Sequence, residues 1–418
     1  MNYIKHPLAI ILAPKVEGDN ISFSLITDRE VVYTYKIPNC DKELFRELFK
    51  VVICTWALGL TTIYRKVRIA FPVTSVEYDF VQRIKMPFFS GMSISTGYYL
   101  MAPPCIGELE FTQLQEEASF SSFLFSPSDF NKVSVGYSGG KESLLSYLLL
   151  KEAGYETHKL FINEGMAPDK DYFSGEQTIY YDNDIWKEVF DVVGKDHWYP
   201  STSLIRLLLN AVYSASNGIG YVVSGNEYSC TGLYFSGVSN SLSFGTAYGQ
   251  SLFAMKEVER YFKLRGVSLS VFSSVQNMDI LTEEVLLYKY FHKEADTQVS
   301  CFNHYEKDGK LNVCGVCPKC ELMNVLMVIL QKNSKYFKLP VTWVTPFLRN
   351  YDIIAVPKNV KTLISEEEIG LYNSLLNSTF PKIHPVQLRF DSLHPAGELP
   401  KRLYDVVTNK VAPFKRIV

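Results

Sequence analysis

Apolar and polar positions alternate in two different ways along the chain, and the change comes near residue 130. The first part mixes short β-branched runs with one long amphipathic helix that Asp41 opens. The predicted strands are Leu8–Leu12, Ile21–Ile26, Val31–Ile37 and Lys66–Val73, and the predicted helix is Lys42–Leu60. The stretch Pro87–Pro104 is rich in Gly, Ser, Tyr and Met and has no clear period. We therefore expect an N-terminal α/β domain over residues 1–130, without a motif of its own.

From Asn131 the pattern becomes strand, helix, strand, which is typical of a parallel sheet with crossover helices. The predicted strands contain Val133 and Val135, His158–Asn163, and Tyr221–Ser224, and the predicted helices start near Lys141 or span Ser203–Asn217, Leu252–Leu264 and Leu322–Gln331. The stretch Ser236–Gln250 is small, polar and Gly-rich, as in a mobile loop over a site. The sequence thus predicts a second domain over residues 131–335 and an extension over 336–418, with a helix near Glu366–Leu376.

A Gly-rich turn joins the strand of Val133 and Val135 to the helix that follows it. The turn reads Ser138, Gly139, Gly140, Lys141, Glu142 and Ser143. The backbone N–H groups of such a turn and the positive end of the helix dipole converge on one point, which suits phosphate oxygens. It is not a Walker loop, because the four-residue gap and the terminal Gly-Lys-Ser/Thr are missing. A phosphate site of another kind is expected here, although a Gly-Gly turn can also serve tight packing alone.

Polar residues end two further predicted strands. Asn163 closes one of them, and Gly225, Asn226 and Glu227 follow another. The carboxyl ends of parallel strands meet at one edge of a sheet, where ligands bind. Asn226 can donate and accept hydrogen bonds to a substrate, and Glu227 can bind Mg²⁺ or an amine. The alternative is that both segments are polar turns without a function.

Four of the eight cysteines cluster late in the chain. Cys301, Cys314, Cys317 and Cys320 have the spacing Cys-x(12)-Cys-x2-Cys-x2-Cys. Two overlapping Cys-x-x-Cys turns and a fourth cysteine across a polar loop fit a tetrahedral thiolate site, and four thiolates without an open position indicate structural Zn²⁺. His304 is an alternative fourth ligand, and an iron–sulfur cluster is the main rival to zinc.

The Gly-rich turn resembles the SGGxDS signature of the PP-loop ATP pyrophosphatases, with Glu142 at the usual Asp position. Together with the cysteine spacing, it makes the stretch Lys132–Gln331 similar to the QueC family of 7-cyano-7-deazaguanine synthases. The resemblance implies an adenine nucleotide alpha hydrolase-like, Rossmann-like parallel sheet with helices on both faces. It also implies that the enzyme uses Mg²⁺-bound ATP to adenylate a carboxylate, with release of pyrophosphate. An amine then displaces AMP.

For such a reaction, individual residues have expected roles. Loop amides and the side chains of Ser138, Lys141 and Ser143 would stabilise the pyrophosphate, and Glu142 and Asn163 would complete the nucleotide site. Asn226 and Glu227 would hold the activated carbonyl.

The flanking segments 1–130 and 336–418 and the absence of an Asp-rich substrate motif depart from the QueC pattern. An enlarged chain of this kind resembles the QueC-like enzymes of anti-phage operons of the type IV CBASS class. That resemblance implies joining a deazaguanine carboxylate to ammonia or to the N-terminal amine of a protein. Two alternatives stay open. One is a MurL-type epimerase of a muramoyl dipeptide, which shares the Gly-Asn-Glu turn but not the segment Ala247–Ser251. The other is a nucleotide sensor without turnover, for which Glu142 is the only sequence indication.

Composition excludes several other classes of protein. A net charge of −2 gives no basic surface for tight binding to a nucleic-acid backbone. The apolar runs Val51–Leu60 and Leu204–Val223 are too short or too interrupted to span a bilayer, and the first residues are too polar for a signal peptide. Clustered cysteines in a long chain suit a reducing compartment. We expect a cytoplasmic protein with no membrane partner, compatible with a homodimer.

Overall fold

The computed structural model of the chain describes most of its first 330 residues and one helix near its end. The described residues are 6–95, 106–115, 128–163, 177–181, 201–226, 233–236, 241–244, 248–276, 278, 280–301, 304–307, 310–329 and 399–411. Glu227, Cys230 and the predicted helix near Glu366–Leu376 lie outside them. Every structural statement below concerns the described residues.

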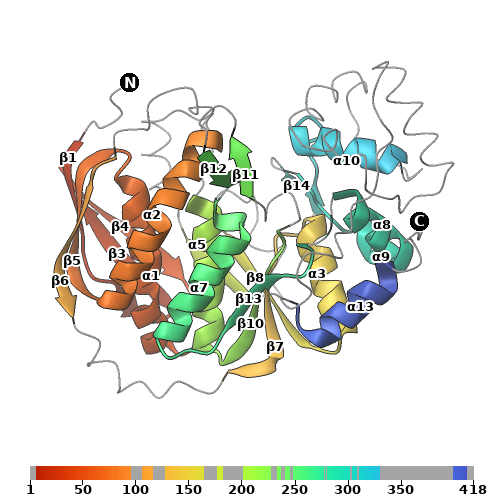
Figure 1. Cartoon of the computed structure of the whole chain (residues 1–418), viewed down its shortest axis with the longest axis horizontal. Helices are drawn as coiled ribbons and strands as arrows, with labels where there is room; N and C mark the ends of the chain where they lie inside the picture. The colour runs from red at the N-terminus through yellow and green to blue at the C-terminus, as the bar shows by residue number, and fades with distance from the viewer. Residues whose placement is uncertain are drawn as a thin grey trace.

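A large mixed sheet runs through the whole molecule (Figure 1). Within the described ranges it has 11 strands in the order β13-β10-β7-β8-β9-β4-β3-β1-β5-β6, with β2 paired to β3. The strands are β1 His6–Ile11, β2 Lys15–Glu17, β3 Asn20–Ile26, β4 Glu30–Lys36, β5 Tyr64–Thr74, β6 Glu108–Gln115, β7 Asp129–Gly136, β8 Glu156–Asn163, β9 Gln177–Tyr181, β10 Ile219–Ser224 and β13 Ser270–Ser273.

The half of the sheet built after residue 128 is entirely parallel. β13, β10, β7, β8 and β9 all run in one direction. Ordered from β9 to β13, these strands stand third, second, first, fourth and fifth in sequence, so the direction of chain progression reverses between β7 and β10. In doubly wound α/β proteins with this order, ligands bind at the carboxyl ends of the strands beside that reversal.

Helices cover both faces of the parallel half. The helices α3 (Lys141–Glu152), α8 (Ile280–Tyr290), α10 (Pro318–Ile329) and α13 (Lys401–Val411) contribute to one buried cluster, and α1 (Lys42–Leu60), α2 (Ser75–Ser95), α5 (Ser201–Ser216) and α7 (Leu252–Leu264) contribute to another. Neighbouring residues of β10 show the division, because Val222 packs in the second cluster and Val223 in the first. This alternation is what a strand buried on both faces produces. The prediction of a parallel-rich α/β sheet is confirmed.

The predicted boundary near residue 130 falls inside a continuous sheet. β4 pairs antiparallel with β9, with Tyr35 opposite Tyr181. Helix α1 and helix α5, from either side of the boundary, belong to one hydrophobic cluster. Helix α1 begins as the sequence predicts, since the Asp41 carboxylate accepts a hydrogen bond from the Leu44 N–H at 3.0 Å. The N-terminal part and the parallel half therefore share both a sheet and a core.

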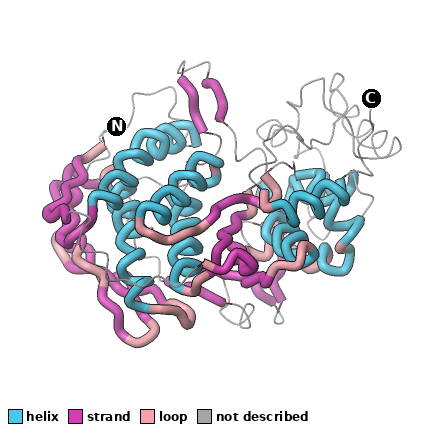
Figure 2. Tube along the Cα trace, turned by 60° about the horizontal axis from the view of Figure 1, so that its bottom comes forward, coloured by secondary structure: helices cyan, strands magenta, loops and turns pink. Residues whose placement is uncertain are grey.

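Two stretches differ from what the sequence pattern predicts. Pro87, placed in a segment without a period, lies inside helix α2, whose residues Ile84 and Phe88 are fully buried. That packing offsets the loss of one backbone donor at the proline. Ser236–Gln250, predicted as a loop, includes the strand β12 (Ser241–Phe244), which pairs with β11 (Leu233–Ser236), and a short 3₁₀ turn at Tyr248–Gln250. Figure 2 shows this strand pair projecting from the body of the molecule.

The end of the chain returns to the parallel half. Leu403 and Val407 of α13 are buried in the same cluster as Leu145 of α3. Lys410 makes an ion pair of 2.8 Å with Glu152 and lies over the ring of Tyr290, 4.1 Å from its centroid. The last part of the predicted C-terminal extension is thus a component of this core. Among the described residues, no helix combines the length and the apolar character needed to cross a membrane.

Candidate functional site

Two segments that the sequence analysis singled out separately lie in contact at the reversal of strand order. One is the turn that joins β7 to α3, and the other is Gly225-Asn226 after β10. A Cβ atom placed on Gly225 would lie 3.0 Å from the Cβ of Glu142 and 3.1 Å from the amide nitrogen of Ser143. A side chain at this position would require the neighbouring turn to shift by a few tenths of an ångström, so glycine favours the close approach of the two backbones. Both predicted segments therefore contribute to one site.

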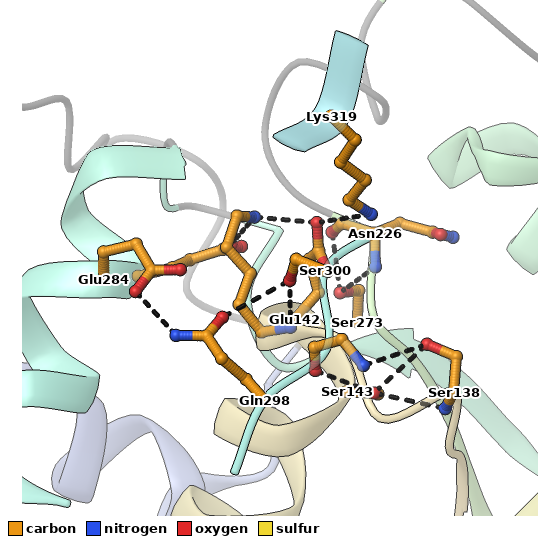
Figure 3. Close-up of polar contacts among 12 residues, drawn as sticks. Ser138, Glu142, Ser143, Asn226, Ser273, Glu284, Gln298, Ser300 and Lys319 are labelled. Carbon is orange, nitrogen blue, oxygen red and sulfur yellow. Dashed lines mark hydrogen bonds and ion pairs between the residues drawn. The ribbon is translucent and has the colours of Figure 1, made fainter. Parts of the chain in front are cut away.

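Hydrogen bonds between the two serines close the Gly-rich turn (Figure 3). The hydroxyl of Ser143 accepts from the Ser138 N–H at 3.2 Å and donates to the Gly140 carbonyl at 3.1 Å. Gly139 has a φ of +76°, in the region that favours glycine. Gly140 caps helix α3 without a side chain. The turn thus presents the positive end of a helix dipole, which suits an anion.

The side chain of Lys141 lies underneath the turn. Its Nζ atom is 2.5 Å from Oε2 of Glu283 on helix α8 and 2.7 Å from Oε1 of Glu142. The Lys141 side chain is 1% exposed and that of Glu283 is 0% exposed. Buried charges need such partners, because an ion that is taken out of water without a counter-charge carries the full cost of desolvation. The positive charge of Lys141 is therefore compensated by two carboxylates.

Glu142 stands between two ammonium groups. Besides Lys141, the Nζ atom of Lys319 lies 3.7 Å from Glu142 Oε1 (Figure 3). Burial by itself raises the pKa of Glu142, but the charges of Lys141 and Lys319 and the hydrogen bond from Lys141 outweigh it and lower the pKa to about 2. Glu142 is therefore ionised at neutral pH, which is the state that a Mg²⁺ ligand requires.

The four predicted cysteines form one compact cluster. The sulfur atoms of Cys301, Cys314, Cys317 and Cys320 all lie within 4.8 Å of one another. The shortest separations are 3.5 Å between Cys317 and Cys320 and 3.7 Å between Cys301 and Cys317. Four thiolates bound to one Zn²⁺ at about 2.3 Å in a tetrahedron stand about 3.8 Å apart. The cluster therefore fits a metal ion such as zinc.

Backbone amides around the cluster support thiolate charge. The N–H groups of Cys314 and Cys317 donate to Sγ of Cys301 and of Cys314, both at 3.3 Å. Gly315, with a φ of +71°, provides the tight turn that brings these amides round. The hydrogen bond with Cys317, burial and the hydrogen bond with Cys301 raise the pKa of the Cys320 thiol. A bound cation would reverse that preference by stabilising the thiolates.

His304 is not a member of this cluster. Its Nδ1 atom lies 3.3 Å from the backbone carbonyl oxygen of Cys301. The four sulfurs make up the only group of at least three metal-binding side chains among the described residues. The alternative in which His304 replaces Cys301 is therefore less well supported than the four-cysteine set.

Segments that carry the cysteines also touch the Gly-rich turn. The Val299 N–H donates to the Gly139 carbonyl at 2.8 Å, and the Lys141 N–H donates to the Ser300 hydroxyl at 3.0 Å. Val299 and Ser300 both lie within two residues of Cys301. Lys319, which contacts Glu142, directly precedes Cys320. The cysteine cluster and the turn are thus joined through three separate contacts.

Asn226 is held by the end of β13. Its backbone N–H donates to the Ser273 hydroxyl at 3.1 Å, and that hydroxyl donates to the Asn226 carbonyl at 2.7 Å. The Asn226 carboxamide donates to Ser224 Oγ at 3.0 Å. Asn163 ends β8, the strand next to β7, so its backbone lies at the same edge of the sheet. Glu227 is outside the described residues, and its role stays a prediction.

Three residues of this site were not predicted from the sequence: Glu283, Ser300 and Lys319. Glu283 and Glu284 are adjacent carboxylates in a mostly apolar helix, and both are fully buried. Such a pair is a usable signal, since glutamate is rarely buried without a partner. Lys319 lies between Cys317 and Cys320, a segment whose sequence predicted metal-binding sulfurs only.

Comparison with known proteins gives no assignment. No protein-family model matches the chain, and no curated protein matches it either.

Proposed function

We propose that this protein is an ATP-dependent enzyme that adenylates a carboxylate, releases pyrophosphate and transfers the acyl group to an amine. The observation that carries the proposal is the contact between the Gly-rich turn after β7 and the Gly225-Asn226 turn after β10 at the reversal of strand order. This is the place where a doubly wound sheet binds nucleotides. The strand order and the SGG-type turn together support a fold of the PP-loop ATP pyrophosphatase class.

In the first step, the turn would hold the β- and γ-phosphates of ATP. The backbone amides of Gly139 and Gly140 and the helix dipole of α3 would stabilise the charge that develops on the leaving pyrophosphate. The hydroxyls of Ser138 and Ser143, already joined to each other, would keep the turn in one shape. Glu142 would help to hold the Mg²⁺ ion, which neutralises phosphate charge. A substrate carboxylate oxygen attacks the α-phosphorus as the bond to pyrophosphate breaks.

In the second step, an amine attacks the carbonyl carbon of the acyl adenylate, loses a proton, and AMP leaves with the former carboxylate oxygen. The carboxamide of Asn226 and the predicted Glu227 would orient the two reactants. Much of the rate enhancement would come from holding them together. The resemblance to the QueC-like enzymes supports a 7-deazaguanine carboxylate as the acid and either ammonia or a protein N-terminus as the amine, in a cytoplasmic setting such as an anti-phage operon.

The cysteine cluster has a structural role in this proposal. Four thiolates leave Zn²⁺ no open position for chemistry. The closed cluster would fix residues 299–301 and 318–320 against the turn. Zinc is favoured over an iron–sulfur cluster because all four sulfurs lie within 4.8 Å of one another, which suits four ligands around one ion.

The test is a product analysis with the full-length protein. Incubation with Mg²⁺, ATP, 7-carboxy-7-deazaguanine and ammonium should give AMP and pyrophosphate in equal amounts. Ser143→Ala should lower this rate by about 100-fold, since it removes a group that shapes the anion site. Cys40→Ser, a partly buried cysteine outside the cluster, serves as the control and should retain the rate. Formation of ADP and phosphate, or unchanged AMP formation in Ser143→Ala, would contradict the proposal.

A further inference from the structure

Two lysines lie at the Gly-rich turn, and they differ in how they meet solvent. Lys141 is 1% exposed and sits between Glu283 and Glu142. Lys319 is 27% exposed, and its Nζ atom lies 3.7 Å from Glu142 Oε1 (Figure 3). An incoming anion can reach a partly exposed ammonium group without breaking a buried ion pair. It could reach Lys141 only by displacing a carboxylate at a cost of several kcal/mol.

On this basis, and resting on the proposed function, we propose that Lys319 is the residue whose ammonium group contacts the terminal phosphates of ATP. Lys141 then acts as a positioning residue that fixes Glu142 and Glu283 beneath the turn. The assignment departs from the motif, which includes Lys141 and leaves Lys319 outside. The proposed phosphate-binding residue therefore lies in the segment that carries the cysteines and not in the Gly-rich turn.

Cys317 and Cys320, which flank Lys319 in the sequence, fix the position of its backbone. It is held between Cys317 and Cys320, whose sulfurs are 3.5 Å apart and buried. The Cys320 N–H donates to Cys317 Sγ at 3.4 Å, which fixes the backbone on which Lys319 stands. A lysine on this closed turn has its backbone already ordered, so binding an anion costs only the entropy of its side chain.

Glu142 supplies the counter-charge that keeps Lys319 near the turn before ATP arrives. Lys319 can exchange part of this interaction for phosphate oxygens, which carry more negative charge and offer several acceptors. Lys141 remains next to Glu142 during that exchange and keeps the carboxylate compensated.

The experiment measures equilibrium binding of Mg²⁺-ATP and of AMP to the full-length, zinc-loaded protein by calorimetry. Lys319→Ala should weaken ATP binding by about 10- to 100-fold, the usual range for losing a charged hydrogen bond, and should leave AMP binding unchanged, since AMP lacks the terminal phosphates. Lys319→Arg should retain most of the affinity. Lys307→Ala is the matched control, because it removes the same charge from an exposed position on strand β14 (Tyr305–Lys307), in the segment between Cys301 and Cys314.

The zinc content of each variant, measured on the same samples, shows whether the cysteine cluster is intact. The proposal is supported if Lys319→Ala loses ATP affinity at full zinc content while Lys307→Ala does not. If wild-type protein binds ATP and Lys319→Ala binds it equally well, or loses ATP and AMP affinity alike, Lys319 is not the phosphate contact and the proposed function still stands. If the wild-type protein itself fails to bind ATP, the proposed function fails together with this assignment.

Discussion

Lys141 and Glu283 are 142 positions apart in the sequence, and their charged groups lie 2.5 Å apart in the interior. The pair links the first turn of α3, where the Gly-rich turn ends, to helix α8. It therefore fixes the helix that supports the anion site to the layer of helices behind it.

Removing one partner of this pair should destabilise the fold strongly. Glu283→Gln keeps the size of the side chain but leaves Lys141 with one carboxylate in a buried place, and we expect a loss of about 3 kcal/mol in the free energy of unfolding. Urea denaturation with an unchanged slope measures it. Arg83→Gln is the control, because its bidentate pair with Glu257 lies at the surface, with Arg83 45% exposed, and should cost less than about 1 kcal/mol. Equal losses in the two variants would show that the buried pair has no special weight.

The stability of the protein should depend on pH through Glu142. Its pKa is about 2 in the folded protein and near the ordinary 4.5 in the unfolded chain. The unfolded chain therefore binds the proton more readily, and the contribution of Glu142 is fully present above about pH 4.5 and is lost as the pH falls towards 2. A shift of this size corresponds to about 3 kcal/mol.

The comparison of wild-type protein with Glu142→Gln isolates this effect. The difference in unfolding free energy between the two should stay constant above about pH 5 and shrink steadily below it. Urea titrations at a series of pH values provide the curve. A difference that is the same at about pH 6 and about pH 3 would mean that the folded environment does not favour the ionised carboxylate.

The cysteine cluster should bind one metal ion per chain. Cys317→Ser removes a ligand whose sulfur lies within 3.7 Å of two others, so the zinc content should fall from about one ion per chain to near zero. Cys40→Ser and His304→Ala should both keep the metal, the first because Cys40 is outside the cluster and the second because its ring contacts a backbone carbonyl. Elemental analysis measures the metal. Iron with sulfide and visible absorbance, in place of zinc, would favour the iron–sulfur alternative.

The close contact at Gly225 should be intolerant of a methyl group. Gly225→Ala would place a Cβ 3.0 Å from Glu142 Cβ and 3.1 Å from the Ser143 amide nitrogen, which forces the two turns of the site apart. We expect ATP binding to weaken by about 10-fold, or 1.4 kcal/mol. Gly136→Ala is a matched control at the end of β7, since its new Cβ would meet other atoms only at 3.6 Å or beyond. Calorimetry with both variants decides the matter, and equal affinities would remove the argument for close approach.

Local features of this molecule could be predicted well from the sequence. The pattern of Ile21–Ile26 corresponds to strand β3, Asn20–Ile26, and Asp41 caps α1 as expected. The spacing of the four cysteines predicted a cluster that the structure brings within 4.8 Å. These features depend on periodicity, capping and short-range turns, all of which act over a few residues.

Long-range features could not be predicted in the same way. The pairing of β4 with β9 places Tyr35 opposite Tyr181, and the sequence of neither strand indicates which strand it pairs with. The same is true of Lys141 and Glu283, whose contact depends on how two helices pack. Pro87 misled the local argument, because tertiary packing of α2 outweighs the cost of proline in a helix. In each case the decisive energy comes from residues that are remote in sequence.

Two other functions predict different observations in the same assays. A nucleotide sensor would bind ATP with normal affinity and release no AMP with any carboxylate. A muramoyl dipeptide epimerase would convert an L-glutamate residue to its D form in the presence of ATP, which chiral analysis of the hydrolysed product detects. Among the described residues, no geometric feature favours the sensor or the epimerase over the adenylating enzyme.

The most direct test of adenylation follows an oxygen atom. In the proposed reaction, a carboxylate oxygen of the substrate attacks the α-phosphorus and leaves with AMP. Incubation of the full-length protein with Mg²⁺, ATP, ammonium and 7-carboxy-7-deazaguanine labelled with heavy oxygen in its carboxylate should therefore give AMP that carries one labelled oxygen, detected by mass spectrometry. Labelled phosphate, or AMP without the label while the substrate is consumed, would contradict the account.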